Sequence, residues 1–199
     1  MPVHSIVWAA LLAAAPAPPL SDVARAIPDA VIDLRYATAE NAFGRAMYPA
    51  GARCLLLPAV ADRLAAVAAR LRADGLRLVL WDCYRPAAVQ RELWGAMPRR
   101  GFVAPPVPGS VHSRGAAVDV AIVAADGGAV PLPTGFDAFE PRAWARATEG
   151  VPPAARRNRD RLRAAMMAEG YKPIRMEGWH FEAPEARGAP VLDVPLGPR

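Results

Sequence analysis

The sequence predicts one α+β domain in which helices pack on a small, mainly antiparallel sheet. Long helical patterns are mixed with short apolar runs, and their order does not follow the regular strand–helix alternation of a parallel α/β fold. The length of 199 residues, without an internal repeat or an evident linker, is typical of a single domain. We expect this domain to occupy residues 21–199.

The helices are predicted by the spacing of apolar residues and by their end signals. Five apolar residues of 59–74 fall on one helical face, and Gly75 follows as a stop signal. A second long helix is expected at 154–169, with arginines on its outer face. A shorter helix should begin near Pro86 and end near Gly95, because proline is well tolerated in a first helical turn.

The strands are predicted by short apolar or alternating runs bounded by turn residues. They are expected at residues 30–36, 76–82, 115–123, 130–132, 171–174 and 179–181. The nearly continuous apolar character of LRLVLWD, at 76–82, indicates a strand buried within the sheet. Along residues 115–123, Asp119 shares a face with Ala117 and Ala121. Val118, Val120 and Ile122 point to the other face.

Residues 1–20 are predicted to be a signal peptide. The apolar run SIVWAALLAAA, at 5–15, is too short to span a bilayer but suits the apolar region of an export signal. The preceding residues carry no lysine or arginine, so a buried or frayed N-terminal helix is the alternative. We therefore expect a periplasmic or extracellular protein without a stable membrane span, with a cytoplasmic location as the alternative.

The net charge of +5 raises the question of a polyanionic partner. Lys172 is the only lysine, and the arginines are scattered along the chain. Their densest run, at 156–163, has the pattern of a solvated helix face. Nucleic acid is therefore not expected as a partner, and the sequence carries no signal for an oligomeric state.

Cys54 and Cys83 are the only two cysteines. An even pair in an exported protein suggests a disulfide, and this inference rests on the compartment rather than on geometry. Two buried free thiols are the alternative, because cysteine is a common core residue.

Four polar residues in two segments predict the chemistry. His112 and Asp119 lie in GSVHSRGAAVDV, and Glu177 and His180 lie in MEGWHFE. The remaining histidine, His4, falls in the predicted signal peptide. Two imidazoles and one carboxylate form a three-ligand zinc site with an open fourth position. A glutamate three residues before the last ligand supplies a base, so the pattern indicates a zinc hydrolase.

Ordinary structural roles are the alternative for each of these residues. Asp119 could be a turn or salt-bridge residue, and His180 taken alone would be a core histidine. Glu177 and His180 are three residues apart and would face opposite sides of a regular strand. We expect Gly178 to permit a bulge or bend that brings both side chains to one cavity.

A hydrolytic mechanism follows from these assignments. Zinc would acidify a water molecule and polarise the scissile carbonyl, and Glu177 would take the water's proton and pass it to the leaving amine. The oxyanion needs a further donor, for which Arg85, in WDCYRP at the end of a strand, is the candidate. A surface or structural arginine is the alternative for Arg85.

Three motifs, DCYRP, S-x-H-S-R-G-x-A-x-D and E-G-W-H, resemble those of the zinc D,D-peptidase family. This family includes D-alanyl-D-alanine dipeptidases and D,D-carboxypeptidases. The motifs occur in the family's order, and DLRYATAEN and PTGFDAF add matches to the dipeptidase branch associated with vancomycin resistance and dipeptide recycling. The resemblance covers about residues 30–185.

The resemblance implies one zinc ion per chain, bound by His112, Asp119 and His180. It also implies that Glu177 is the catalytic base and that Arg85 stabilises the transition-state oxygen.

Three further residues are expected at the substrate. By resemblance, Ser110 would lie at the substrate-binding edge of the first zinc motif. Asp137 would hold the free ammonium of a dipeptide, with an ordinary turn aspartate as its alternative. Tyr36 would line the pocket, with a packed strand tyrosine as its alternative. The sequence departs from the family at Ala42–Phe43, where an Asn-Phe pair is expected, and this loop shapes the pocket entrance.

The function expected from the resemblance is hydrolysis of D-alanyl-D-alanine, serving the turnover of cell-wall peptides. A D,D-carboxypeptidase acting on longer peptidoglycan stem peptides is the close alternative. The alternative of another class is a non-catalytic zinc protein that binds wall peptide or a partner.

Overall fold

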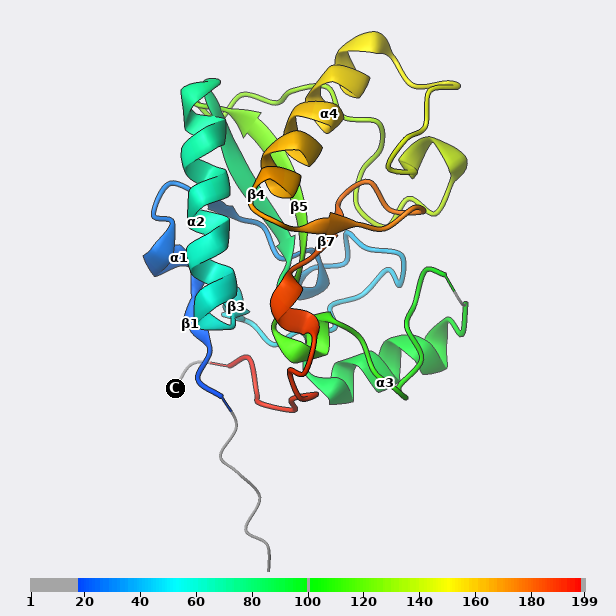
Figure 1. The fold of residues 1–199 in the computed structure, drawn as a ribbon. Helices are drawn as coiled ribbons and strands as arrows, with labels where there is room; N and C mark the ends of the chain where they lie inside the picture. The colour runs from blue at the N-terminus through cyan, green and yellow to red at the C-terminus, as the bar shows by residue number, and fades with distance from the viewer. Residues whose placement is uncertain (1–17, 100, 198–199) are drawn as a thin grey trace, which may run out of the picture.

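Among the described residues, 18–99 and 101–197, five strands form the central sheet of this computed structural model (Figure 1). Their order across the sheet is β2 (Val31–Ile32), β4 (Leu76–Asp82), β5 (Ala117–Ala124), β7 (His180–Glu182) and β6 (Lys172–Pro173). The β2–β4 pair is parallel, and the other pairs are antiparallel. The predicted α+β class with a mainly antiparallel sheet is therefore confirmed.

The remaining elements surround this sheet. A small antiparallel pair joins β1 (Ser21–Asp22) to β3 (Leu55–Leu56). The helices are α1 (Val23–Ala26), α2 (Pro58–Ala73), α3 (Ala87–Ala96) and α4 (Pro153–Ala168). Short 3-10 turns occur at Arg35–Ala37, His112–Arg114, Pro141–Ala143 and Pro184–Ala186.

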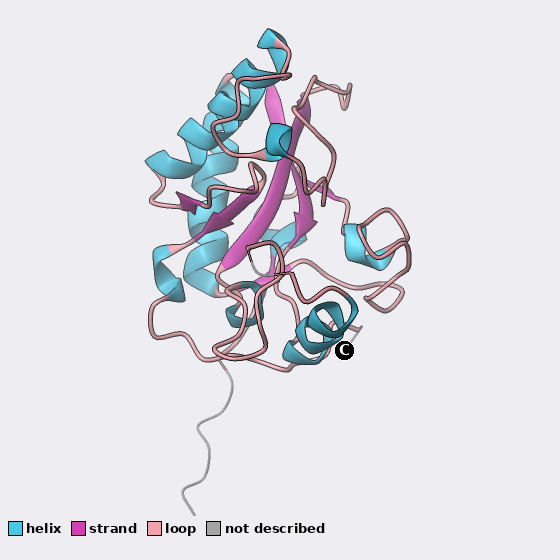
Figure 2. Cartoon of the chain, turned by 90° about the vertical axis from the view of Figure 1, so that its right-hand side faces the viewer, coloured by secondary structure: helices cyan, strands magenta, loops and turns pink. Residues whose placement is uncertain are grey.

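The two long helices, α2 and α4, cover the same face of the sheet, and Figure 2 shows loops on the opposite side. On the helix-covered face, Val118, Val120 and Ile122 of β5 belong to the main apolar core. On the other face, Ala121 packs with Trp81 of β4 and with Trp179. The alternation predicted along β5 is confirmed, and it leaves Asp119 on the loop-covered face.

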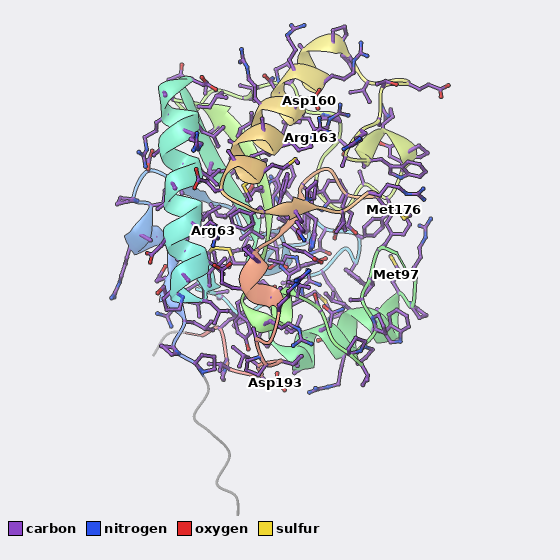
Figure 3. All side chains as sticks on the ribbon, in the orientation of Figure 1. Arg63, Met97, Asp160, Arg163, Met176 and Asp193 are labelled. Carbon is purple, nitrogen blue, oxygen red and sulfur yellow. A yellow bond between two sulfur atoms is a disulfide. The ribbon has the colours of Figure 1, made fainter. Side chains whose placement is uncertain are left out.

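Arg63 connects the helical layer to two other segments (Figure 3). Its guanidinium donates to the carbonyl oxygen of Glu169, just after α4, at 2.8 Å and forms an ion pair with Glu185 at 2.6 Å. These contacts hold α2 beside α4 and beside the segment that follows β7.

Two predicted strands differ from the observed structure. Residues 30–36 form a strand only at Val31–Ile32, after which the chain turns at Arg35–Ala37. The backbone N–H groups of Ala37 and Thr38 donate within this turn, to the carbonyl oxygens of Leu34 and Arg35, instead of continuing the ladder. Residues 130–132 form no strand in the described structure, and the neighbouring contact is a single bridge between Val123 and Ala129. Proline in the sequence PLP, at 131–133, cannot donate to a strand ladder.

The C-terminal segment after β7 packs on the chain near α3, which its sequence pattern did not predict. Leu192 and Leu196 are buried, and the Asp193 carboxylate accepts a hydrogen bond from the backbone of Ala88 at 2.8 Å. Asp193 thus caps the first turn of α3, where unpaired N–H groups favour an anion (Figure 3).

Cys54 and Cys83 form the predicted disulfide, which connects the start of β3 to the end of β4. Both residues are buried. None of the helices described here is long and apolar enough to cross a membrane.

Removing the disulfide should lower stability without changing the fold. The Cys54→Ala/Cys83→Ala double variant is expected to lose about 3–4 kcal/mol of unfolding free energy, because a loop of this length then regains chain entropy in the unfolded state. Urea unfolding measures the loss. Reductant should destabilise the wild type but leave the variant unchanged; an equal response of both proteins would contradict the prediction.

Candidate active site

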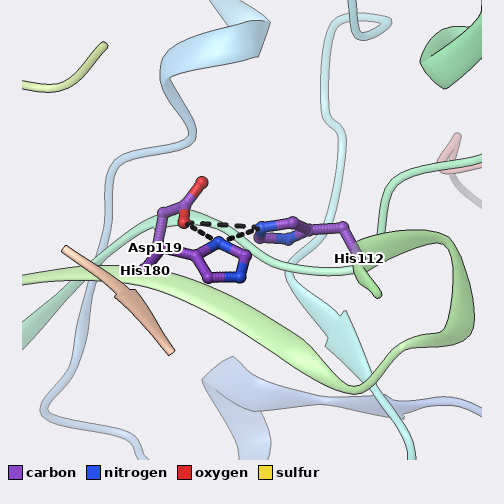
Figure 4. Close-up of side chains that lie close together, drawn as sticks. All are labelled: His112, Asp119 and His180. Carbon is purple, nitrogen blue, oxygen red and sulfur yellow. Dashed lines mark hydrogen bonds and ion pairs between the residues drawn. The ribbon is translucent and has the colours of Figure 1, made fainter. Parts of the chain in front are cut away.

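His112, Asp119 and His180 form a buried cluster at the sheet (Figure 4). Asp119 of β5 lies directly opposite His180 of β7 in the antiparallel pairing. His112 begins the 3-10 turn that precedes β5. One ligand atom from each residue lies within 4.8 Å of the others. The structure thus brings together three side chains that are far apart in the sequence.

Gly115 allows His112 to approach Asp119 from the preceding turn. Its φ of 66° is in the left-handed region, and a Cβ atom there would lie only 3.3 Å from the backbone nitrogen of Leu57. A residue with a side chain would be strained in this conformation and would crowd that backbone. Glycine therefore lets the chain leave the turn and enter β5 two residues later.

Each histidine directs one ring nitrogen towards Asp119. Asp119 Oδ1 lies 3.0 Å from Nδ1 of His180 and 3.4 Å from Nε2 of His112, and these two nitrogens are 3.1 Å apart. The other nitrogen of His112 donates to the carbonyl oxygen of Cys83 at 2.8 Å. The other nitrogen of His180 lies 3.6 Å from a carboxylate oxygen of Glu182.

These outer contacts favour metal binding. Because the Nδ1–H of His112 is used by a carbonyl, its Nε2 presents a lone pair to the cluster. Nitrogen and oxygen ligands about 2.0–2.1 Å from a tetrahedral zinc ion are about 3.3 Å from one another. The observed separations of 3.0, 3.1 and 3.4 Å fit that arrangement. The three residues could therefore hold a divalent metal ion.

The cluster is also electrostatically suited to a cation. Burial opposes ionisation of Asp119, but His112 and His180 hold the pKa of its carboxyl well below the usual range. Burial likewise opposes protonation of His180, yet interactions with Asp119 and Glu182 raise the pKa of this imidazole to about 10. The negative groups around the cluster thus attract positive charge.

Glu177 lies beside this cluster at the start of a tight turn. Its Oε2 is 3.9 Å from Nδ1 of His180, and both side chains line one cavity. Gly178 fits closely here, because a Cβ at this position would lie 2.9 Å from the carbonyl oxygen of Ala143. Burial, with the negative charges of Asp119 and Asp137, raises the pKa of Glu177 to about 8.

Arg85 is buried and held in place by two side chains. Its Nε and Nη2 both donate to Oδ2 of Asp82, at 3.0 and 2.6 Å, and Nη1 donates to Oε1 of Gln90 at 2.8 Å. Its Nη2 is 4.0 Å from Oδ2 of Asp119. The guanidinium carbon lies 4.9 Å from the centroid of the Tyr36 ring. Arg85 is thus an oriented, buried cation beside the cluster.

Asp82 is a site residue that sequence reasoning missed. It is fully buried, and its Oδ1 accepts hydrogen bonds from the Tyr48 hydroxyl at 2.5 Å and from the Cys83 backbone at 2.9 Å. Its Oδ2, which binds Arg85, is also 3.5 Å from Nδ1 of His112. The signal was visible in the sequence, because an aspartate ends a buried strand that is apolar except for Arg77.

A cavity of about 360 Å³ opens over these groups. Its lining includes all eight residues expected at the metal or the substrate, namely Tyr36, Arg85, Ser110, His112, Asp119, Asp137, Glu177 and His180. The loop formed by residues 101–105, which sequence analysis did not single out, provides another part of the wall.

Asp137 lies on the wall of this cavity in an unusual conformation. Its φ is 54°, and its carboxylate accepts hydrogen bonds from the Tyr36 hydroxyl at 3.4 Å and from the Ala42 backbone at 3.1 Å. Burial raises the pKa of Asp137 to about 7. The loop in which Ala42–Phe43 departs from the family pattern therefore contacts Asp137 through its backbone.

Ser110 lies on another part of the cavity wall. Its Oγ accepts a hydrogen bond from the His112 backbone at 3.2 Å.

A sequence comparison assigns the family. Residues 17–195 match the family described as D-ala-D-ala dipeptidase. The chain belongs to this family.

Relatives named D-alanyl-D-alanine dipeptidase support this family assignment. The D-alanyl-D-alanine dipeptidase of Escherichia coli K12 is 41% identical over 87% of this chain and 89% of its own length. Proteins of the same name from Enterococcus faecalis V583 and Streptomyces coelicolor are each 32% identical. The match to the E. faecalis protein covers 75% of this chain and 84% of that protein. The match to the S. coelicolor protein covers 77% of this chain and 85% of that protein.

Asp82→Ala should strongly destabilise this D-ala-D-ala dipeptidase family member. The change leaves Arg85 buried without its carboxylate partner, for which we expect a loss of about 3–5 kcal/mol in unfolding free energy. Glu140→Ala, which breaks the exposed pair with Arg142 at 2.8 Å, is the matched control. It should cost about 1 kcal/mol or less. Denaturant unfolding measures both, and equal losses would argue against the buried pair.

Proposed function

We propose that this protein is a zinc-dependent dipeptidase that hydrolyses D-alanyl-D-alanine. The observation that carries the proposal is the convergence of a His-Asp-His donor set, Glu177, Arg85 and Asp137 on one cavity of about 360 Å³. Relatives named D-alanyl-D-alanine dipeptidase support the substrate. Two imidazoles and one carboxylate suit zinc.

The proposed roles divide metal binding from proton transfer. Zinc held by His112, Asp119 and His180 would supply the Lewis acidity that polarises a peptide carbonyl and acidifies water. Glu177 borders that donor set, and its buried carboxylate is a stronger proton acceptor than an exposed one. Glu177 therefore accepts the proton of the attacking water and returns it to the leaving amine.

Arg85 has the position and charge to stabilise the oxyanion. Asp82 and Gln90 hold its guanidinium in place before substrate binds, so little reorganisation is needed when negative charge develops on the carbonyl oxygen. Its proximity to Asp119, with Nη2 at 4.0 Å from Oδ2, puts this donor next to the metal-binding cluster.

Asp137 supports recognition of a dipeptide rather than a longer peptide. Its buried carboxylate lines the same cavity, where it would pair with the free ammonium of D-alanyl-D-alanine. An acylated amine cannot form this ion pair. Ser110 and Tyr36 also line this cavity, and the Tyr36 hydroxyl donates a hydrogen bond to Asp137.

We also propose that the enzyme is exported and acts in the turnover of wall peptides. The predicted signal peptide, residues 1–20, supports this location, although 1–17 lie outside the described residues. The disulfide between Cys54 and Cys83 adds support, because such bonds persist mainly in oxidising compartments.

Glu177→Gln should separate catalysis from metal binding. We expect kcat for D-alanyl-D-alanine to fall at least about 100-fold, because the amide cannot accept the water's proton. Zinc content, measured by elemental analysis, should stay at one equivalent per chain. His180→Ala is the control that should lose both zinc and activity. A Glu177→Gln variant with full activity would reject the assigned base.

Asp137→Asn should weaken the recognition of a free amine. We expect kcat/KM for D-alanyl-D-alanine to fall about 10- to 100-fold, since a charge-assisted contact is lost. N-acetyl-D-alanyl-D-alanine should be a poor substrate for both proteins, and the substitution should change its rate little. Released D-alanine measures each reaction.

The wild type should also be assayed with a stem pentapeptide that ends in D-alanyl-D-alanine. Efficient release of D-alanine from that pentapeptide would indicate a D,D-carboxypeptidase. Failure to hydrolyse either substrate at full zinc occupancy would favour a non-catalytic wall-peptide or partner-binding protein.

A further inference from the structure

Gln90 occupies a buried position between the arginine of the site and the wall of the cavity. It lies on α3, is 1% exposed, and is the only glutamine in the sequence. Its Oε1 accepts from Arg85 Nη1 at 2.8 Å, and its Nε2 donates to the carbonyl oxygen of Ala104 at 2.7 Å. Arginine can only donate and a carbonyl can only accept, so these partners determine the orientation of the amide.

The contact with Gln90 restrains a motion of Arg85 that Asp82 leaves possible. Both hydrogen bonds from Arg85 to Asp82 end on the same atom, Oδ2. A guanidinium held at a single oxygen can still pivot about that point. Gln90 binds the third nitrogen, Nη1, and thereby fixes the direction in which the remaining N–H groups face the cavity.

The other end of Gln90 anchors a loop in which three of the ten residues lack a backbone N–H group. Residues 101–110 include Pro105, Pro106 and Pro108, which have no N–H group. Several residues of this loop line the cavity, and Gly101 lies against the side chain of Met176, next to Glu177 (Figure 3). The hydrogen bond to Ala104 therefore ties the cavity wall to the same amide that orients Arg85.

We propose that Gln90 is a positioning residue that couples the orientation of Arg85 to the placement of the 101–110 loop. This inference rests on the proposed dipeptidase function and extends it to a residue outside the cavity lining. Gln90 acts through Arg85 on the transition state and through the loop on substrate binding.

Two substitutions separate these effects. Gln90→Met removes both hydrogen bonds while keeping a side chain of similar length, and kcat for D-alanyl-D-alanine should fall about 10- to 100-fold. Gln90→Glu keeps an acceptor for Arg85 but places an oxygen against the Ala104 carbonyl. It should therefore raise KM and leave kcat within about threefold of the wild type, because the arginine stays oriented.

Asn158→Leu is the matched control, because Asn158 also donates from a side-chain amide to a backbone carbonyl, that of Pro131 at 2.9 Å. This contact is not part of the cavity, so kcat and KM should stay at the wild-type values. Amide hydrogen exchange, followed by mass spectrometry, gives a readout independent of activity. Exchange in residues 101–110 should accelerate in both Gln90 variants and stay unchanged in Asn158→Leu.

A double-mutant cycle tests whether Gln90 acts through Arg85. In an Arg85→Ala background, Gln90→Met should cause less than about a twofold further loss of kcat. A loss as large as in the wild-type background, or a folded and zinc-loaded Gln90→Met variant with wild-type kcat, would overturn the inference. A wild type inactive on D-alanyl-D-alanine would instead reject the proposed function, and this inference with it.

Discussion

The buried carboxylate of Asp82 is the constraint on which the rest of the site depends. Asp82 is fully buried, so its negative charge must be compensated by hydrogen-bond donors or a cation, since an unpaired charge inside a protein is very unfavourable. Its partners are Arg85, the Tyr48 hydroxyl and the Cys83 backbone, and His112 lies 3.5 Å away. Satisfying this one charge therefore orients the arginine and keeps it next to an imidazole of the cluster.

The sheet supplies the geometry that makes this compensation possible. Between Leu80 and Asp82 the pairing of β4 with β5 shifts in register, so that Asp82 lies opposite Asp119. Regular alternation would have put Asp82 on the helix-covered face with Leu80. The irregularity instead turns its carboxylate towards the site, as β-bulges often do near functional residues. The apolar face packed by two long helices thus supports an opposite face that carries Asp119 beside a second, smaller apolar cluster.

The long elements were predictable because their signals are local. The helix expected at 59–74 is observed as Pro58–Ala73, and the one expected at 154–169 as Pro153–Ala168. Short edge strands were less predictable. The strand expected at residues 30–36 is observed only as β2, Val31–Ile32, which lies at the edge of the sheet and ends before a turn. Packing of the C-terminal segment on α3 had no periodic signal at all.

The motifs alone predicted that two histidines, Asp119 and Glu177 share one site, and they supplied the kinds of donor, acceptor and charge found there. The contacts that hold these groups in place depend on the fold. Asp119 and His180 are brought together by strand pairing, whereas Asp82 and Gln90 acquire their roles through contacts with Tyr48 and with the carbonyl of Ala104. A hydrogen bond between distant segments forms only where the fold places the backbone and side-chain atoms close together in space. Residue type and local periodicity do not predict where the atoms of distant segments lie.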